Sequence, residues 1–346
     1  MGFRFRSLVV FMRAHTRPDP TWELHGTSPS GSRPAPNLRV HSHDAHCIFQ
    51  ETRMMTDLPH SSTEPPGAQR PRSVGVCSWS LQPIGPKLLV ELVRNCGMEA
   101  VQLALNPLIT HPRDWADTFM YLQDAGIRVL SGMMSSIGED YSSLDSIRRT
   151  GGLLPDATWP RTLEQMLRVA DLAAESSIRL VSFHAGFIPH EPDAPERRVM
   201  VKRLQTVVDA FSERSIHLAL ETGQETAATL LEVLEQIDRP TLGVNFDPAN
   251  MILYDKGDPV EALTMLAPHV VQLHIKDARP TATPGSWGQE VVVGEGAVDW
   301  PALLEVVHSL PEEVDLVIER ETGTQRIADV ITAHGILKSH LPGSVH

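Results

Sequence analysis

The sequence predicts an α/β protein whose catalytic part folds as a single (β/α)₈ barrel, the TIM-barrel fold. Strand-like apolar stretches alternate with helical stretches eight times over roughly 270 residues, which is the usual size of such a barrel. Five of the apolar stretches also stop at a His, Asp or Glu, as parallel strands that meet at one catalytic mouth would. They read SFHAG, ALETG, VNFDP, VVQLHIKD and VIERE.

The first half of the chain supplies three of the strands, at residues 74–79, 101–105 and 127–133. The helical patterns around them predict helices over residues 86–97, 113–126 and 161–177. Gly97 ends the first of these helices, because glycine adopts the left-handed conformation of a helix C-terminus without steric cost. The polar stretch up to residue 160 is long enough to form a lid or an active-site loop.

The second half repeats the rhythm five times. Strands are expected at residues 179–186, 217–223, 241–248, 270–277 and 314–321, and helices at 196–213, 225–237, 258–268, 300–309 and 325–338. A doubly wound open sheet is the alternative architecture. That fold would be expected to carry a glycine-rich phosphate-binding turn, and the sequence contains neither G-x-G-x-x-G nor a Walker motif.

Residues 1–72 differ from the rest of the chain. They hold nine Arg, no Lys and six acidic residues, a net charge of +3, which leaves −16 for the remainder of the total of −13. The segment is rich in Pro, Ser, His and Arg and shows little periodicity, which is typical of disorder. We therefore expect either a disordered tail or a start site placed too far upstream, followed by a barrel domain over residues 73–341.

Charge and composition narrow the class of partner. The acidic balance disfavours binding to nucleic acid, whose phosphates it repels. The chain has three cysteines, Cys47, Cys77 and Cys96. Because the number is odd and no C-x-x-C pattern is present, a disulfide framework is not expected and a reducing compartment is. No apolar run reaches the roughly 18 residues that a membrane span needs. The sequence thus predicts a cytoplasmic protein without a membrane partner, and it leaves homo-oligomerisation open.

Side-chain alternation places the terminal polar residues inside the barrel. If His274 faces the interior, Gln272 does too, while Leu273 and Ile275 face the surrounding helices. Four other strands show the same alternation, with polar terminal residues on the interior side and apolar neighbours outside. Those terminal residues are His184, Glu221, Asp247 and Glu319.

Four of these side chains predict a metal site. Taken singly, a strand-end carboxylate is more often a helix cap or ion pair, and a lone strand histidine is more often a core residue. Three carboxylates and one imidazole on four consecutive strands would repel each other unless a cation neutralised them. This set of donors suits Mn²⁺, Mg²⁺, Co²⁺ or Zn²⁺. The predicted ligands of one divalent ion are Glu221, Asp247, His274 and Glu319.

Six short segments of the second half carry a family resemblance. They are HAG at 184–186, ETGQET at 221–226, NFDPAN at 245–250, HIKDAR at 274–279, GEGAVDW at 294–300 and IERE at 318–321. Together they resemble the sugar phosphate isomerase/epimerase superfamily, the xylose-isomerase-like TIM barrels, to which endonuclease IV is distantly related. The resemblance implies that the four predicted ligands hold one metal and that Glu221 and Glu319 are the catalytic acid/base pair.

The resemblance also implies a reaction class and a carbohydrate substrate. We expect a metal-dependent isomerase or epimerase of a sugar or sugar-like polyol, which removes a proton next to a carbonyl through a metal-stabilised enediolate. A dehydratase or keto-sugar lyase on the same site is the alternative. An endonuclease IV-like nuclease would need three zinc ions, and a non-enzymatic sugar-binding barrel would show no turnover.

Five further residues are predicted to contact the substrate. Trp79 could stack on a sugar ring, and His184 could bind a substrate oxygen. Asn250 stands where epimerases of the family commonly carry a substrate-contacting His, and Lys276 shares the interior parity of His274. Arg279 corresponds, at approximate spacing, to a substrate-binding Arg of the family.

Overall fold

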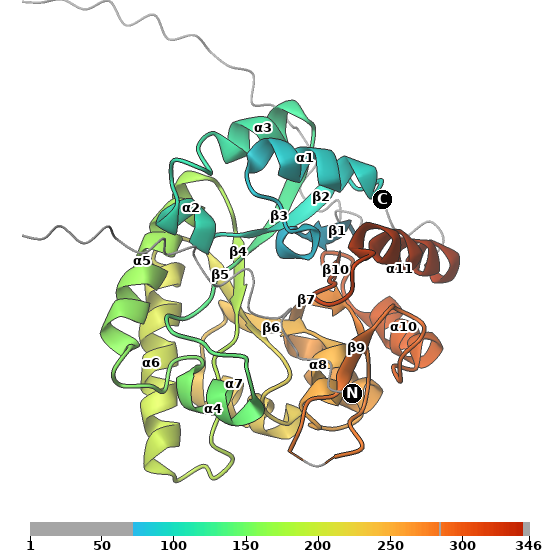
Figure 1. The fold of residues 1–346 in the computed structure, drawn as a ribbon. Coiled ribbons are helices and arrows are strands. Elements are labelled where there is room, and N and C mark those ends of the chain that lie inside the picture. The colour runs from blue at the N-terminus through green and yellow to red at the C-terminus, as the bar shows by residue number, and fades with distance from the viewer. Residues whose placement is uncertain (1–71, 284, 342–346) are drawn as a thin grey trace, which may run out of the picture. The chain divides into compact units, whose positions relative to one another are not determined.

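Eight parallel strands close into a barrel that a ring of helices surrounds (Figure 1). The computed structural model describes residues 72–283 and 285–341. Neighbouring strands follow chain order, and the first strand closes the barrel against the last, with Val74 paired to Leu316. The predicted fold class is confirmed. The barrel strands are β1 (Val74–Cys77), β2 (Ala100–Ala104), β3 (Arg128–Met133), β4 (Leu180–Phe183), β5 (His217–Glu221), β6 (Leu242–Phe246), β7 (Val270–Ile275) and β10 (Asp315–Ile318).

All eight predicted helices are present, with ends that shift by a few residues. The largest difference is the second, predicted from residue 113, which begins at residue 118 because Asp117 before it adopts a left-handed conformation with φ of 58°. Gly97, with φ of 69°, follows the first helix as predicted. These helices are α1 (Pro86–Asn95), α3 (Thr118–Asp124), α5 (Trp159–Glu175), α6 (Pro195–Ser212), α7 (Ala227–Ile237), α9 (Pro259–Leu266), α10 (Trp300–Ser309) and α11 (Arg326–His340).

Short elements that the sequence pattern did not predict follow several strands. The predicted strand 270–277 is split, because Asp277 begins a separate antiparallel hairpin with residues 289–291. Asp247 caps a helix that was also not expected, by accepting a hydrogen bond from the backbone N–H of Asn250 at 3.0 Å. The additional elements are α2 (Asn106–Thr110), α4 (Leu144–Thr150), α8 (Pro248–Leu253), β8 (Asp277–Arg279), β9 (Gln289–Val291) and the 3₁₀ turns η1 (Ser78–Leu81) and η2 (Ala267–His269).

The first segment of the domain prediction, residues 1–72, lies almost entirely outside the described residues. Residues 1–71 lie outside the described part, so a disordered tail and an upstream start site both stay predictions. Arg72, the last residue of that segment, is buried and its Nε donates to the Val314 carbonyl at 2.9 Å. Among the described helices, none is both long enough and apolar enough to cross a membrane.

The two faces of the strands have different chemistry. Outward residues such as Leu220, Phe246 and Leu273 are buried in the apolar layer between strands and helices, as the alternation predicted. Inward residues are polar and bond to each other. Gln102 Nε2 donates to Gln272 Oε1 and to Ser182 Oγ, each at 2.8 Å. This polar interior, which includes Gln272 as predicted, supports the residues at the barrel mouth.

Candidate metal centre

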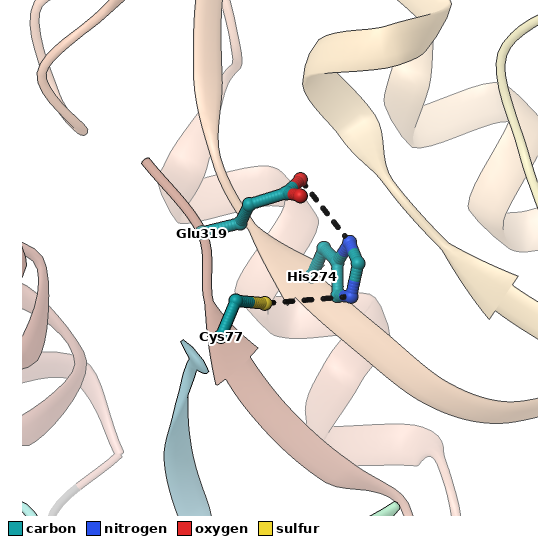
Figure 2. A group of neighbouring side chains, drawn as sticks. All are labelled: Cys77, His274 and Glu319. Atoms are coloured by element: carbon teal, nitrogen blue, oxygen red, sulfur yellow. Dashed lines mark hydrogen bonds and ion pairs between the residues drawn. The ribbon is translucent and has the colours of Figure 1, made fainter. Parts of the chain in front are cut away.

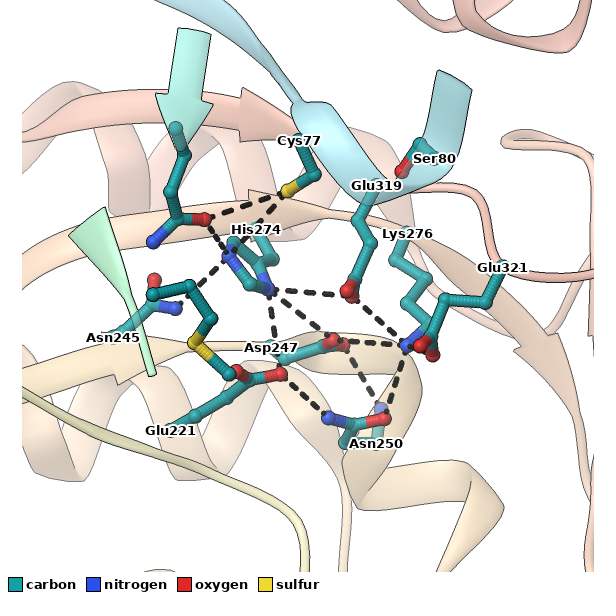
Figure 3. A network of polar contacts seen from close by, with 12 residues as sticks. Cys77, Ser80, Glu221, Asn245, Asp247, Asn250, His274, Lys276, Glu319 and Glu321 are labelled. Atoms are coloured by element: carbon teal, nitrogen blue, oxygen red, sulfur yellow. Dashed lines mark hydrogen bonds and ion pairs between the residues drawn. The ribbon is translucent and has the colours of Figure 1, made fainter. Parts of the chain in front are cut away.

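Four predicted side chains meet at the carboxyl ends of four adjacent strands, as Figure 3 shows. Glu221 ends β5, Asp247 follows β6, His274 lies in β7 and Glu319 follows β10. One ligand atom from each lies within 4.8 Å of the others. From His274 Nδ1 the carboxylate oxygens of Glu221, Asp247 and Glu319 are 3.4, 3.7 and 3.3 Å away. We call these four residues the candidate metal centre.

The hydrogen bonds of His274 determine which of its ring nitrogens faces the carboxylates. Nε2 lies 2.7 Å from Gln102 Oε1, and an amide oxygen only accepts hydrogen bonds, so Nε2 carries the proton. The Asn245 amide is 2.9 Å from the same nitrogen and can turn its partnerless oxygen toward that N–H. Nδ1 is therefore the ring nitrogen that faces the three carboxylates, and a bound cation would take the place of a proton on it.

The donor atoms of the centre fit a divalent cation. Glu221 Oε2, Asp247 Oδ2 and His274 Nδ1 are buried and have no hydrogen-bond partner among the described residues. Leaving a buried polar atom unpaired costs about 1–3 kcal/mol, so three such atoms on separate strands need an explanation. A cation that accepts all three lone pairs supplies one, and carboxylate with imidazole is a common ligand set for such ions.

A second group of possible ligands shares His274 and Glu319 with the centre and adds Cys77. Figure 2 shows that Cys77 and Glu319 approach different nitrogens of the ring, with Cys77 Sγ 3.8 Å from His274 Nε2. Burial raises the pKa of Cys77, so its sulfur stays a neutral thiol, and Gln102 already holds Nε2. The carboxylate side of the ring is therefore the better metal site. Because both groups use His274, they are not two separate sites. The groups found among the described residues therefore form a site for one ion.

Lys276 was predicted to contact the substrate, but its side chain is buried among the carboxylates of the centre. Its buried ammonium is 2.9 Å from Glu319 Oε2, 2.7 Å from Glu321 Oε2 and 3.6 Å from Asp247 Oδ2. Burial alone would raise the pKa of Glu319, but Lys276 and His274 lower it to about 2. Burial raises the pKa of Glu321 to about 7, although Lys276 opposes that shift. Lys276 thus balances part of the negative charge.

Three of the predicted substrate contacts border a cavity of about 170 Å³ beside the centre. Trp79 donates its indole N–H to Glu319 Oε1 at 2.6 Å. Asn250 Nδ2 donates to Glu221 Oε1 at 3.0 Å, and His184 Nε2 is 3.4 Å from the same oxygen. Arg279 is not brought to this cavity. Its side chain is exposed and its Nε donates to the Glu295 carbonyl at 2.9 Å.

The cavity has an acidic floor and walls that are largely aromatic and apolar. We call it the first cavity. Its walls suit the C–H faces of a sugar or cyclic polyol, because aromatic rings pack against them, and its carboxylates suit hydroxyl groups. It is lined by Trp79, Ala104, Asn106, Pro107, Met133, Met134, Ser135, Tyr141, His184, Asn250, Leu253, Tyr254, Trp287, Gly288, Glu290, Glu319, Glu321 and Thr322.

Several residues around the centre and the first cavity were missed in the sequence. Cys77 and Gln102 lie inside the barrel on strands whose ends carry no charged residue, so alternation alone did not single them out. Tyr141 lies in the predicted lid or loop region, while Tyr254 and Glu290 come from or beside the short elements that were not predicted. Cys77 lies two residues before Trp79, and residues two apart on a strand face the same side. This alternation was the one signal in the sequence that could have placed Cys77 inside the barrel.

Asp277 explains why two of the motifs occur together. Its carboxylate accepts hydrogen bonds from the backbone N–H groups of Gly294 and Gly296 and from the indole N–H of Trp300. A Cβ atom at Gly296 would lie 1.9 Å from Asp277 Oδ1, so only glycine fits there. HIKD and GEGAVDW therefore form one structural unit, which holds the loop before α10 against β8.

Most of the chain matches a known family. A family model for the xylose isomerase-like TIM barrel matches residues 90–340. The chain belongs to this family. The xylose isomerase domain protein from Planctomyces limnophilus is 30% identical, with a TM-score of 0.70 over 79% of this chain and 97% of that one. The resemblance noted in the sequence is confirmed.

Curated members of the xylose isomerase-like family differ in reaction. The 3-oxo-isoapionate decarboxylase of Pectobacterium atrosepticum is 26% identical, over 50% of this chain and 66% of its own length. The 3-dehydroshikimate dehydratase of Bacillus anthracis is 26% identical, over 35% and 45%. A putative L-ribulose-5-phosphate 3-epimerase of Escherichia coli is 23% identical, over 74% and 91%. The chain spans just under two thirds of the first of these and less than half of the second.

Proposed function

We propose that the protein is a divalent-metal-dependent isomerase or epimerase of a sugar or sugar-like polyol. The observation that carries this proposal is the candidate metal centre, in which three buried donor atoms without hydrogen bonds to the described residues converge beside a cavity. The reaction would remove a proton from the carbon next to a carbonyl group and return it to that carbon or its neighbour. The substrate would be a small, hydroxyl-rich molecule in the first cavity.

The chemistry of the relatives supports this class of reaction. Decarboxylation of a 3-oxo acid, loss of water beside a ketone and epimerisation next to a carbonyl all pass through negative charge on the same enolate-like group. A bound divalent cation would polarise the carbonyl and stabilise that charge. One site can therefore serve several substrates within one family, and the residues around it select the outcome.

The two glutamates have different roles in this proposal because their oxygens have different partners. Glu221 Oε2 is buried and without a hydrogen bond, while Oε1 accepts from Asn250. An ionised carboxylate oxygen has two lone pairs, so Glu221 Oε2 can face the cation with one of them and take the proton with the other. Both oxygens of Glu319 are engaged, Oε1 by Trp79 and Oε2 by Lys276. Glu319 can return a proton on the opposite face only after one of these bonds opens.

The same asymmetry favours a dehydratase or keto-sugar lyase as the second candidate function. Epimerisation needs two groups that exchange protons on opposite faces of one carbon, whereas elimination needs one base and a donor for the leaving group. Glu221 is a single available base. Glu321, which lines the first cavity and is paired with Lys276, follows β10, three strands from β5, and could assist a leaving hydroxyl.

Solvent exchange tests the proposal directly. The Mn²⁺-loaded protein would be incubated in D₂O with a panel of ketoses, keto-sugars and inososes, and the products followed by NMR. An epimerase or isomerase incorporates deuterium next to the carbonyl, whereas a lyase or dehydratase releases a smaller or dehydrated product. Glu221→Gln should abolish both, and Glu235→Gln on the exposed face of α7 should change neither. Turnover that persists in Glu221→Gln would contradict the mechanism.

A further inference from the structure

A second cavity, of about 540 Å³, lies near the first and is not used by the proposed reaction. The side chain of Tyr254 lines the first cavity, and its ring contacts Phe187 of the second cavity at 5.9 Å between centroids. Gln224, also of the second cavity, donates to the Tyr254 hydroxyl at 3.2 Å. The second cavity is lined by Arg148, Leu154, Phe187, Ile188, Pro189, His190, Gln224, Glu225, Thr226, Thr229 and Lys256.

Two cations of the second cavity have no anionic side chain bonded to them. The Arg148 guanidinium carbon lies 4.9 Å from the centre of the Phe187 ring, and Lys256 Nζ lies 6.0 Å from it. Neither side chain makes an ion pair or hydrogen bond with another residue that the structure describes. Other arginines of the barrel, such as Arg197 and Arg320, are paired with carboxylates. The two charges around Phe187 are therefore available to a ligand.

The start of α7 adds donors and positive potential to the same cavity. Thr226 caps this eleven-residue helix, and Thr229 lies in its first turn. The free N–H groups of a helix N-terminus carry partial positive charge and bind anions. Gln224, two residues earlier, is buried, and its Oε1 has no hydrogen-bond partner among the described residues. With its amide turned over, Gln224 would accept from the Tyr254 hydroxyl and offer its N–H groups to the cavity, so it can serve an anionic ligand.

The one acidic residue of the lining does not cancel this charge. Glu225 is buried, and burial raises its pKa to about 8, although Lys256 opposes that shift. At neutral pH its carboxyl is therefore mostly protonated. The cavity then offers two positive side chains, the positive end of α7 and the hydroxyl groups of Thr226 and Thr229, which bond each other, to whatever enters it.

We propose that the second cavity binds the phosphate group of a small molecule, held by Arg148, Lys256 and the first turn of α7. A phosphate dianion matches two cations in charge, and its oxygens match the hydroxyl and backbone donors around them. This inference does not rest on the proposed reaction, because it involves none of the residues of the candidate metal centre.

Titration of the full-length protein with inorganic phosphate by calorimetry tests the site. We expect saturable binding that weakens at least tenfold in the double variant Arg148→Gln/Lys256→Gln. Arg149→Gln, which removes the same charge from the same helix outside the cavity lining, should bind phosphate as the unchanged protein does. A second titration with glycerol 3-phosphate shows whether the site prefers a phosphate ester or free phosphate. Tight binding of either compound supports the site.

Three results would overturn the inference. One is the absence of saturable binding. Another is binding that the double variant retains but a chelator abolishes, which would move the phosphate to the metal centre. The third is acetate binding as tight as phosphate binding, which would show a site for any small anion. Circular dichroism checks that the double variant still folds as the unchanged protein does.

Discussion

The ammonium of Lys276 lies 2.9 Å from Oε2 of Glu319, and both groups are buried at the mouth of the barrel. The same ammonium contacts Glu321 and approaches Asp247. It is the one lysine or arginine of the described residues that the structure pairs with a carboxylate of the candidate metal centre. Its position makes the charge balance of the centre depend on a residue that is not itself a ligand.

Replacing Lys276 should therefore destabilise the metal-free protein more than the metal-loaded one. Removing one partner of a buried ion pair costs about 3–5 kcal/mol, because the remaining carboxylates are left uncompensated. We expect Lys276→Met to lower the thermal midpoint in EDTA and Mn²⁺ to raise it by more than in the unchanged protein. Lys338→Met, an exposed site on α11, is the matched control. An equal response to Mn²⁺ in both proteins would refute this role.

Gln102 should tune metal affinity through His274. Gln102→Met keeps the size of the side chain but removes the acceptor that holds the proton on Nε2. Outer partners of a metal-bound histidine typically contribute about 10–100-fold to affinity, so Mn²⁺ binding by calorimetry should weaken by that factor. Ser131→Ala is the control, because Ser131 bonds to Gln272 but not to His274. Equal losses in both variants would indicate a general effect on the barrel interior.

Glu221 and Glu319 should respond differently to the same substitution. Glu221→Gln removes the free carboxylate oxygen, and loss of a catalytic base costs about 10²–10⁴-fold in rate. For an isomerase or epimerase, Glu319→Gln should also lower the rate strongly. For a dehydratase or lyase, proton removal from substrate should persist in Glu319→Gln. Deuterium incorporation under single-turnover conditions separates the two cases, provided that each variant still binds Mn²⁺.

Glu225 should make the protein less stable as the pH rises. Its pKa in the folded protein is about 8, against 4.5 for the ordinary carboxyl, so the folded state holds a proton that the unfolded state has released. Stability from this residue is therefore full below pH 4.5 and declines as the pH rises to about 8. Urea unfolding from pH 5 to pH 8 should show a shallower decline in Glu225→Gln than in Glu235→Gln. Identical declines in stability in the two variants would show that a group other than Glu225 causes the pH dependence.

Metal content distinguishes the proposed enzyme from the nuclease alternative. The candidate metal centre provides for one ion, so about one equivalent of Mn²⁺ should bind per chain and be lost in Asp247→Asn. Endonuclease IV-like chemistry would need three ions. Elemental analysis after dialysis against Mn²⁺ and against Zn²⁺ measures the number of metal ions per chain. Three equivalents of Zn²⁺ would favour the nuclease alternative over the proposed enzyme.

Sequence periodicity accounted for most of the fold and for the set of residues at the mouth. Each barrel strand is short, apolar and flanked by helical patterns, and strand alternation is a local property that follows from backbone geometry. The side chains at 221, 247, 274 and 319 were therefore expected to converge. Short elements such as α8 and the β8–β9 hairpin were missed because tertiary contacts, such as the bonds around Asp277, stabilise them rather than a local pattern.

The sequence by itself determined that the strand ends carry acidic and imidazole groups on one side of a barrel. Only the tertiary structure decided which atoms face each other. Gln102 lies 172 positions from His274 in the chain and still selects its Nδ1 as the free nitrogen. Lys276 turned out to bridge carboxylates, whereas Arg279, three residues later, points to solvent. Alternation along a strand specifies a face, but partners from distant strands specify the bond.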